Sequence, residues 1–312
     1  MATSGSIDFS VSGGDIVKGA MRALNAIAAG ETPEASEAAD GLEALNMLVK
    51  QWMAPPNMIA PGLKMWARKH ITLALSATAE YTIKLRRLAF SSGGTYTIAV
   101  GDTITGATGA ATAVICAIEI TSGTLAGGDA AGELIINSQT GTFESETLNV
   151  GTNTNVATIT TNSTQYGPPV GIVEAILRSS SDQDTPMFPM TERAYMEIAD
   201  KTATGNPGQY YFEKRTDDAK IYLDRVPNDT TYTIFMIILR PLEDIDAAAN
   251  DVDFSREWYR PLKYALAVDL FEEYPTTEQK LRRLERRAGE ALLQAQSFTP
   301  EETDLYFQPG LD

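Results

Sequence analysis

The spacing of apolar residues predicts two helices near the beginning of the chain. The first carries an apolar stripe at three- and four-residue spacing, made of Ile16, Ala20, Leu24 and Ile27. We expect it to begin near Asp15 and to end at Gly30. The second has Thr32 as its cap and Pro33 at its first helical position. Its apolar face consists of Ala38, Leu42, Leu45, Leu48 and Val49.

The same spacing predicts two helices near the end of the chain. One covers residues 258–273, with Pro261 close to its start. The other begins at residues 276–279 (TTEQ), which have the pattern of a capping box. Its apolar side consists of Leu281, Leu284, Ala288, Ala291, Leu292 and Ala295.

The middle of the chain has the alternating pattern of strands. The expected strands outside the most polar stretch cover residues 70–75, 81–83, 172–177, 210–212, 219–223 and 231–239. A short helix is expected at residues 191–198, with Thr191 as its cap. Residues 90–166 contain no Lys or Arg, and Thr, Gly, Ala and Val dominate there. The β-prone runs in this stretch are residues 96–100, 113–120, 133–136 and 156–161. The turn at residues 127–129 (GGD) fits a hairpin.

These elements predict an α+β fold. We expect helical N- and C-terminal parts around a small antiparallel sheet, with residues 85–166 inserted as an all-β sandwich or barrel. Residues 1–84 and 167–298 would then form the core domain, and residues 299–312 an extended tail. Insertions of this kind are tolerated where the ends of the inserted domain lie close together.

Charge narrows the classes of partner. The 312 residues carry 41 Asp and Glu against 25 Lys and Arg, a formal net charge of −16. Tight binding to nucleic acid needs the opposite sign, because cations must displace counterions from the phosphates. No apolar run approaches the roughly 20 residues that span a bilayer, so no membrane association is expected. The first residues have no basic segment followed by an apolar one, so no secretion signal is expected.

Candidate catalytic groups are few. A single histidine, His70, and a single cysteine, Cys116, exclude zinc sites built from those residues, and Cys116 lies in an apolar run typical of a core. Three acid pairs occur: Glu144 with Glu146, Asp244 with Asp246, and Asp251 with Asp253. We interpret them as solvated loops. The sequence therefore predicts a protein that is not an enzyme and that uses no metal or other cofactor.

Two features of the last forty residues suggest binding. A basic cluster lies largely off the apolar stripe of the final helix and comprises Lys280, Arg282, Arg283, Arg286 and Arg287. It is either a solvated face supported by nearby glutamates or a docking surface for an acidic partner or DNA phosphates. Leu305, Tyr306 and Phe307 are consecutive in an otherwise polar tail, as anchors that bury in a partner would be.

Several segments together resemble one family. They are residues 23–33 (ALNAIAAGETP), 37–48 (EAADGLEALNML), 195–207 (YMEIADKTATGNP), 221–227 (IYLDRVP) and 264–274 (YALAVDLFEEY). Their order and spacing resemble the head-to-tail adaptors of short-tailed bacteriophages, also called packaged-DNA stabilisation or tail accessory factors. The resemblance covers residues 15–83 and 167–298, and shorter members of the family lack the insert at 85–166.

The resemblance implies a structural virion protein in the neck, assembled in the host cytoplasm. Such adaptors form a homo-oligomeric ring, usually of twelve copies, between the portal protein and the tail tube or nozzle. Packaged double-stranded DNA passes through the ring during ejection without specific binding. The family's C-terminal helix and tail dock on the portal, which here implies Lys280, Arg283, Arg287, Leu305, Tyr306 and Phe307 as docking residues.

Two alternatives remain at this point. The β insert of a phage surface module would bind carbohydrate or a host receptor, with Tyr96 and Tyr166 as rings for sugar stacking. A cell-wall hydrolase would use an acid pair, of which Glu144 with Glu146 is the candidate.

Overall fold

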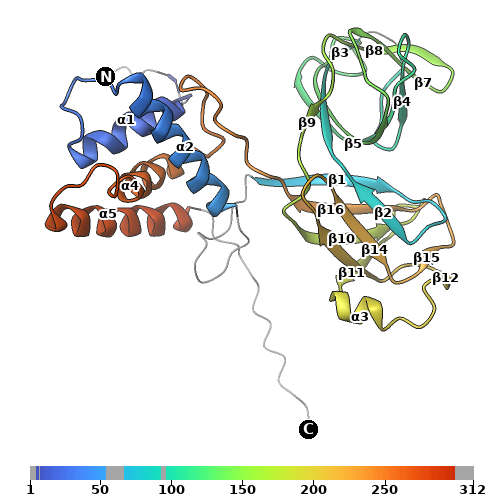
Figure 1. The fold of residues 1–312 in the computed structure, drawn as a ribbon. Coiled ribbons are helices and arrows are strands. Elements are labelled where there is room, and N and C mark those ends of the chain that lie inside the picture. Colours follow the sequence, from blue (N-terminus) through green and yellow to red (C-terminus); the bar gives the residue numbers. More distant parts are fainter. Residues whose placement is uncertain (1–4, 7, 54–66, 93–95, 299–312) are drawn as a thin grey trace. The chain divides into compact units, whose positions relative to one another are not determined.

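The computed structural model describes residues 5–6, 8–53, 67–92 and 96–298, and its chain divides into two compact units. The helical unit combines residues 1–66 with residues 242–312, and the β unit is the intervening segment 67–241. Apart from one short helix (Glu192–Met196) in the β unit, the helices and the named strands belong to separate units, which Figure 1 shows in the colours of the sequence.

The helical unit packs helices from both ends of the chain around one aromatic centre. Its elements are α1 (Gly13–Leu24), α2 (Ala35–Trp52), the 3-10 helix η2 (Arg256–Trp258), α4 (Tyr259–Asp269) and α5 (Glu278–Ser297). Trp258 is fully buried, and its ring meets that of Trp52 edge-on at a centroid distance of 5.8 Å. Phe254 packs against both rings. Large aromatic rings of this kind contribute much of the buried apolar area in a small unit.

Several helix boundaries differ from the sequence-based prediction. The helix expected at residues 258–273, for example, ends at Asp269. α1 ends at Leu24 and not at Gly30, because Asn25 adopts a left-handed conformation (φ 66°) and its N–H bonds back to the last turn. Asn tolerates this conformation better than most residues other than Gly. α2 begins at Ala35 and not at Pro33, because Glu34 and Glu37 form a reciprocal capping box two residues beyond Thr32.

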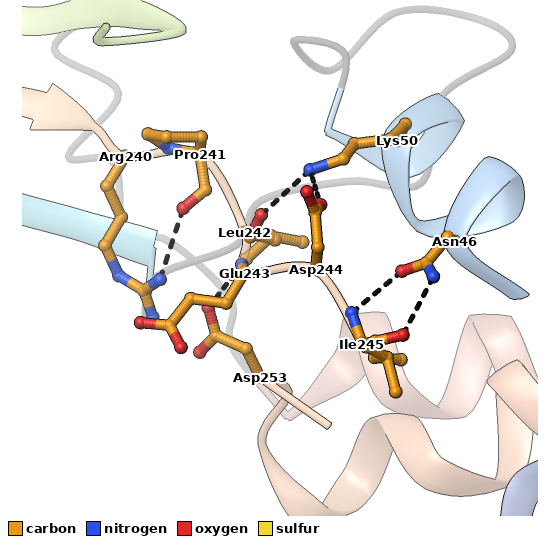
Figure 2. Close-up of polar contacts among 9 residues, drawn as sticks. All are labelled: Asn46, Lys50, Arg240, Pro241, Leu242, Glu243, Asp244, Ile245 and Asp253. Atoms are coloured by element: carbon orange, nitrogen blue, oxygen red, sulfur yellow. Dashed lines mark hydrogen bonds and ion pairs between the residues drawn. The ribbon is translucent and has the colours of Figure 1, made fainter. Parts of the chain in front are cut away.

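The segment that returns from the β unit is fastened to α2 by polar contacts (Figure 2). The Asn46 side chain donates to the Ile245 carbonyl at 3.0 Å and accepts from the Ile245 N–H at 2.9 Å. Lys50 donates to the Leu242 carbonyl at 3.2 Å and forms an ion pair with Asp244. The amide of Asn46 thus pairs with the extended backbone as a neighbouring strand would.

The β unit contains an open seven-stranded sheet in the order β1-β16-β10-β11-β13-β14-β2. Its strands are β1 (Arg68–Ala74), β2 (Glu80–Ile83), β10 (Gly171–Arg178), β11 (Asp184–Pro189), β13 (Gln209–Lys214), β14 (Ala219–Leu223) and β16 (Thr233–Leu239). All neighbours are antiparallel except β11 and β13. The short helix α3 (Glu192–Met196) follows β11, and its predicted cap is confirmed, since Thr191 accepts from the Ala194 N–H. A separate parallel pair joins β12 (Thr204–Gly205) and β15 (Val226–Pro227).

The second sheet of the β unit closes into a six-stranded barrel. Its strands are β3 (Arg86–Ser92), β4 (Thr103–Gly106), β5 (Thr112–Ser122), β6 (Ala131–Thr140), β7 (Glu146–Val150) and β8 (Asn153–Ile159). Closure comes from β3, which pairs with β6 along one edge and with β8 along the other. The short β9 (Thr164–Gln165) adds to β3. The predicted hairpin at residues 127–129 is confirmed, because it joins the antiparallel strands β5 and β6.

The α+β prediction is wrong. Among the described residues, 34% are in strands and 25% in helices, and the strands form a closed barrel and a half-barrel. The sheet is not a small core between terminal helices, because it joins residues as distant as Arg68 and Leu239 and belongs to a different unit from the helices. The predicted strand at residues 96–100 is also absent, since these residues form bends and turns although Ile98 is buried.

The barrel and the open sheet share part of one apolar core. Cys116 of β5 and Ile135 of β6 are buried together with Ile71, Ile83 and other residues of the sheet. The prediction that Cys116 is a core residue is confirmed. Its burial raises the pKa of the thiol to about 12, so the reactive thiolate is suppressed at neutral pH.

Candidate functional site

The final helix places its positive charges on the surface away from its packed side. Leu284, Ala291 and Ala295 of α5 are buried in the helical unit. The N-terminal half of the helix carries the basic cluster, in which Arg283 and Arg287 are exposed. The two residues are four apart and therefore lie on one side of the helix.

The basic residues of α5 fall into two sets. Arg282 lies 3.9 Å from Glu278 and Arg286 lies 3.7 Å from Glu290, both at helical spacing of four. These pairs fit the reading of a solvated face supported by glutamates. Arg283 and Arg287 have no carboxylate partner among the residues that the structure describes. The helix thus neutralises one side and leaves the other positively charged.

α4 adds two further cations to the unneutralised side. The ring of Tyr264 has the Lys263 ammonium 5.5 Å from its centroid, the Arg260 guanidinium at 5.9 Å and the Arg287 guanidinium at 6.0 Å. We call Arg260, Lys263, Arg283 and Arg287 the basic helix face. In the described part of the chain none of the four forms an ion pair with a carboxylate.

The positive charges of this face lie close to one another. A cation over an exposed aromatic ring gains about 0.5–1 kcal/mol, and three cations around one ring also repel one another. Lys280 stands nearby on α5, and its pKa is lowered by partial burial and then by the positive charge of Arg283. An acidic partner would relieve this repulsion.

Local packing holds the face in place. Gly19 of α1 lies under the side chain of Lys263, and a Cβ at that position would come within 3.2 Å of the lysine Cδ and Cε. The aliphatic part of Lys263 therefore packs on α1 while its ammonium reaches Tyr264. Sequence reasoning missed Arg260 and Lys263 because they belong to a different helix from the basic cluster. Arg260 and Lys263 precede Tyr264 by four residues and by one residue. This local spacing does not indicate that Arg287 of α5 lies beside the same ring.

The acid pair in the barrel is structural. Glu146 is buried, and its carboxylate accepts from the N–H groups of Thr108 at 2.6 Å, Gly109 at 3.1 Å and Glu144 at 3.2 Å. Burial acts to raise the pKa of Glu146, but the three N–H donors outweigh it and the net pKa is lowered. The interpretation of Glu146 as a solvated loop residue is wrong, since it begins strand β7.

In each of the other two acid pairs, one of the two carboxylates makes a polar contact, and the two pairs use different partners. Asp244 pairs with Lys50, and Asp253 accepts from the Glu243 N–H at 3.1 Å. Asp246 and Asp251 are exposed. Within the described residues, no three His, Cys, Asp or Glu side chains come together as a metal site.

The remaining candidates are distributed over the β unit. His70 is exposed on β1, where its ring meets Phe235 edge-on at 5.4 Å. Tyr96 packs against the barrel core and its hydroxyl donates to Asp102 at 3.1 Å. Tyr166 packs against the core shared with the open sheet. Both tyrosine rings are half-buried.

The tail anchors Leu305, Tyr306 and Phe307 lie outside the described residues. Lys280, Arg283 and Arg287 lie together on α5. Across the described ranges, no helix combines the length and the apolar character needed to cross a bilayer.

Comparison with known proteins adds no name to this site. No protein-family model matches the chain, and no curated protein sequence matches it.

Proposed function

We propose that this chain is a structural head-to-tail adaptor of a tailed bacteriophage, which forms a ring between the portal protein and the tail. The observation that carries the proposal is the basic helix face. Arg260, Lys263 and Arg287 converge on Tyr264 in a chain whose formal net charge is −16. Such a face fits an acidic surface of a neighbouring protein, and the family resemblance identifies that neighbour as the portal.

The rest of the chain fits passage of DNA without adhesion. Residues 90–166, which include every barrel strand except the first four residues of β3, contain no Lys or Arg, so this stretch offers phosphates no cationic contacts. The cations of the basic helix face would be covered by the portal after docking. The ring then presents a surface of low affinity to the DNA that passes through it.

The test is attachment to the portal. Purified protein is mixed with the portal of the same phage, and the product is imaged by electron microscopy. We expect rings on the portal with the wild type and their loss with Arg283→Gln combined with Arg287→Gln. Arg282→Gln is the matched control, because it removes a positive charge from the neutralised side of the same helix.

Two results would overturn the proposal. A wild-type chain that never decorates the portal would exclude the adaptor function. Equal attachment of the double variant and the Arg282→Gln control would exclude the basic helix face. Removal of residues 299–312 tests Leu305, Tyr306 and Phe307 separately, and we expect at least a tenfold loss of affinity if two such anchors are buried.

A further inference from the structure

A polar pocket of about 320 Å³ lies in the β unit where the barrel meets the open sheet. Lys84 lines it from the connection between β2 and β3, Arg86 from the start of β3, and Asn137, Ser138 and Gln139 from β6. The volume is within the range of small-molecule sites, at its lower end. Every side chain named here is polar, and no carboxylate lines the pocket.

A bulge in β6 shapes one wall. Thr112 of β5 is opposite Thr140, but Val114 is opposite Asn137, so β6 contains one residue more than its partner. Ser138 takes the left-handed conformation (φ 56°) that this extra residue requires. Bulges re-aim side chains and are common beside binding sites. A serine in this conformation carries a backbone strain that Gly or Asn would largely avoid.

Asn137 fixes the floor of the pocket. It is only 2% exposed, accepts from the Lys84 N–H at 2.9 Å and donates to the Thr82 carbonyl at 3.0 Å. The amide thereby ties the barrel strand to the backbone on both sides of Ile83. The backbone that carries Lys84 is held in place before any ligand arrives.

Arg86 is also held in place. Its Nε donates to the Ser163 hydroxyl at 2.8 Å, and Nη2 donates to the Ser163 carbonyl at 2.9 Å. The buried Ser163 hydroxyl donates in turn to Gln139 Oε1 at 2.7 Å. These neutral partners orient the guanidinium and leave its charge uncompensated. Nη1 has no partner among the described residues.

The two cations are exceptional in their neighbourhood. Lys69 pairs with Glu119, Arg87 lies 3.9 Å from Glu133, and Lys220 pairs with Glu80. Lys84 and Arg86 have no such carboxylate in the described part of the chain. Arg86, held by Ser163, and the exposed Lys84 thus bring two positive charges to a polar pocket of a strongly acidic protein, and such a pair attracts an anion.

We propose that this pocket binds a small oxyanion group, a carboxylate or a phosphate, carried by a polar ligand such as an acidic sugar. Lys84 supplies a mobile positive charge and Arg86 supplies an oriented N–H donor. The amide and hydroxyl groups of Gln139 and Ser138 face the polar remainder of the ligand. The proposal does not depend on the adaptor function, because none of these residues belongs to the basic helix face.

Binding is tested on the full chain by NMR titration or calorimetry with three probes: inorganic phosphate, glucuronate and glucose. We expect roughly millimolar binding of at least one anion and none of neutral glucose, as a site with few contacts would give. A stronger response to phosphate identifies a phosphate group as the ligand. A stronger response to glucuronate identifies a carboxylated sugar.

Lys84→Gln is the decisive variant. Its side chain is exposed and makes no contact that folding requires, so the variant should fold normally. We expect at least a tenfold loss of anion affinity, the effect of removing one charge-assisted hydrogen bond. Lys214→Gln is the matched control, since Lys214 is an exposed lysine of β13 outside the pocket.

The proposal fails if neither anion binds, if neutral glucose binds as well as the anion that binds best, or if Lys84→Gln and Lys214→Gln behave alike. Ser163→Ala gives a second measurement, because it removes the hydroxyl that orients Arg86 and leaves both charges present. We expect it to weaken anion binding about threefold to tenfold, within the range of one neutral hydrogen bond. Unchanged affinity in that variant would exclude the orienting role of Ser163.

Discussion

The barrel and the helical unit treat their charged groups in opposite ways. In the barrel, Glu146 is buried and satisfied by three backbone N–H groups. In the helical unit, Arg260, Lys263 and Arg287 surround the half-buried ring of Tyr264 without a carboxylate partner in the described residues. The first arrangement lowers the free energy of the folded chain by itself, whereas the second leaves positive charge on the surface. Glu146 therefore supports folding, and we propose that the basic helix face supports recognition.

Replacing the buried carboxylate should give the largest effect on stability. Glu146→Ala leaves three N–H donors without an acceptor, and we expect the free energy of unfolding to fall by about 2–4 kcal/mol. The measurement is urea unfolding followed by barrel resonances in NMR. Glu144→Ala is the control, because the exposed Glu144 contributes only its backbone N–H to the contact. A fall of less than about 0.5 kcal/mol in the free energy of unfolding would show that Glu146 has no structural role.

Lowering the pH should reproduce part of this loss of stability, because it protonates Glu146. The folded-state pKa of Glu146 is lowered, so its contribution is fully present above the unfolded value of about 4.3. That contribution is lost as the pH falls through the folded-state pKa. We expect the stability of the wild type to decline below about pH 4 more steeply than that of Glu146→Gln. Parallel stability curves for the two proteins would show that the carboxylate does not carry the effect.

Variants of the basic helix face should show the reverse pattern. Arg283→Gln with Arg287→Gln should change the free energy of unfolding by less than about 0.5 kcal/mol, because surface charges contribute little. A small gain in stability is expected from the relief of repulsion around Tyr264. Thermal unfolding at low and high salt measures it, and the difference should shrink as salt screens the charges. A loss above about 1 kcal/mol would mean that the face stabilises the fold.

The smallest effect concerns the residue that supports the face. Gly19→Ala would bring a Cβ to 3.2 Å from Lys263 Cδ and Cε, which a flexible lysine can avoid by a small shift. Stability should change little, since alanine also favours the helix, while portal affinity should fall no more than about threefold. Portal binding measured beside Lys263→Gln separates the position of the ammonium from its presence.

Local features of the sequence predicted the elements better than their assembly. The apolar stripes of α1 and α2 and the Thr191 cap could be recognised because each depends on residues within a few turns. The pairing of the open seven-stranded sheet could not be recognised. It joins residues that are far apart in the sequence, such as Arg68 and Leu239, and no local pattern indicates which strands pair. Glu146 was misinterpreted for the same reason, since its donors Thr108 and Gly109 lie nearly forty residues away.

The candidate site shows the same limit. Lys280, Arg283 and Arg287 were accessible as a basic cluster on one predicted helix. Arg260 and Lys263 required the packing of α4 on α5, which places Tyr264 between cations from both helices. The polar pocket required the closure of the barrel onto the stretch 82–86. Lys84 and Arg86 do not stand out in the sequence, and they line a pocket only because the residues of β6 lie beside them.

The strand register also determines when each part of the β unit can form during synthesis. The partners of every barrel strand lie between Arg86 and Gln165, so the barrel has all its pairings once that stretch has left the ribosome. Strand β1 is made earlier, yet its partner β16 ends at Leu239. At about 5–20 residues per second, β1 waits on the order of ten seconds or more for that partner. The order of the strands along the chain therefore leaves β1 unpaired early in synthesis. During that time the completed barrel is the folded part of the β unit that lies next to β1 in the sequence.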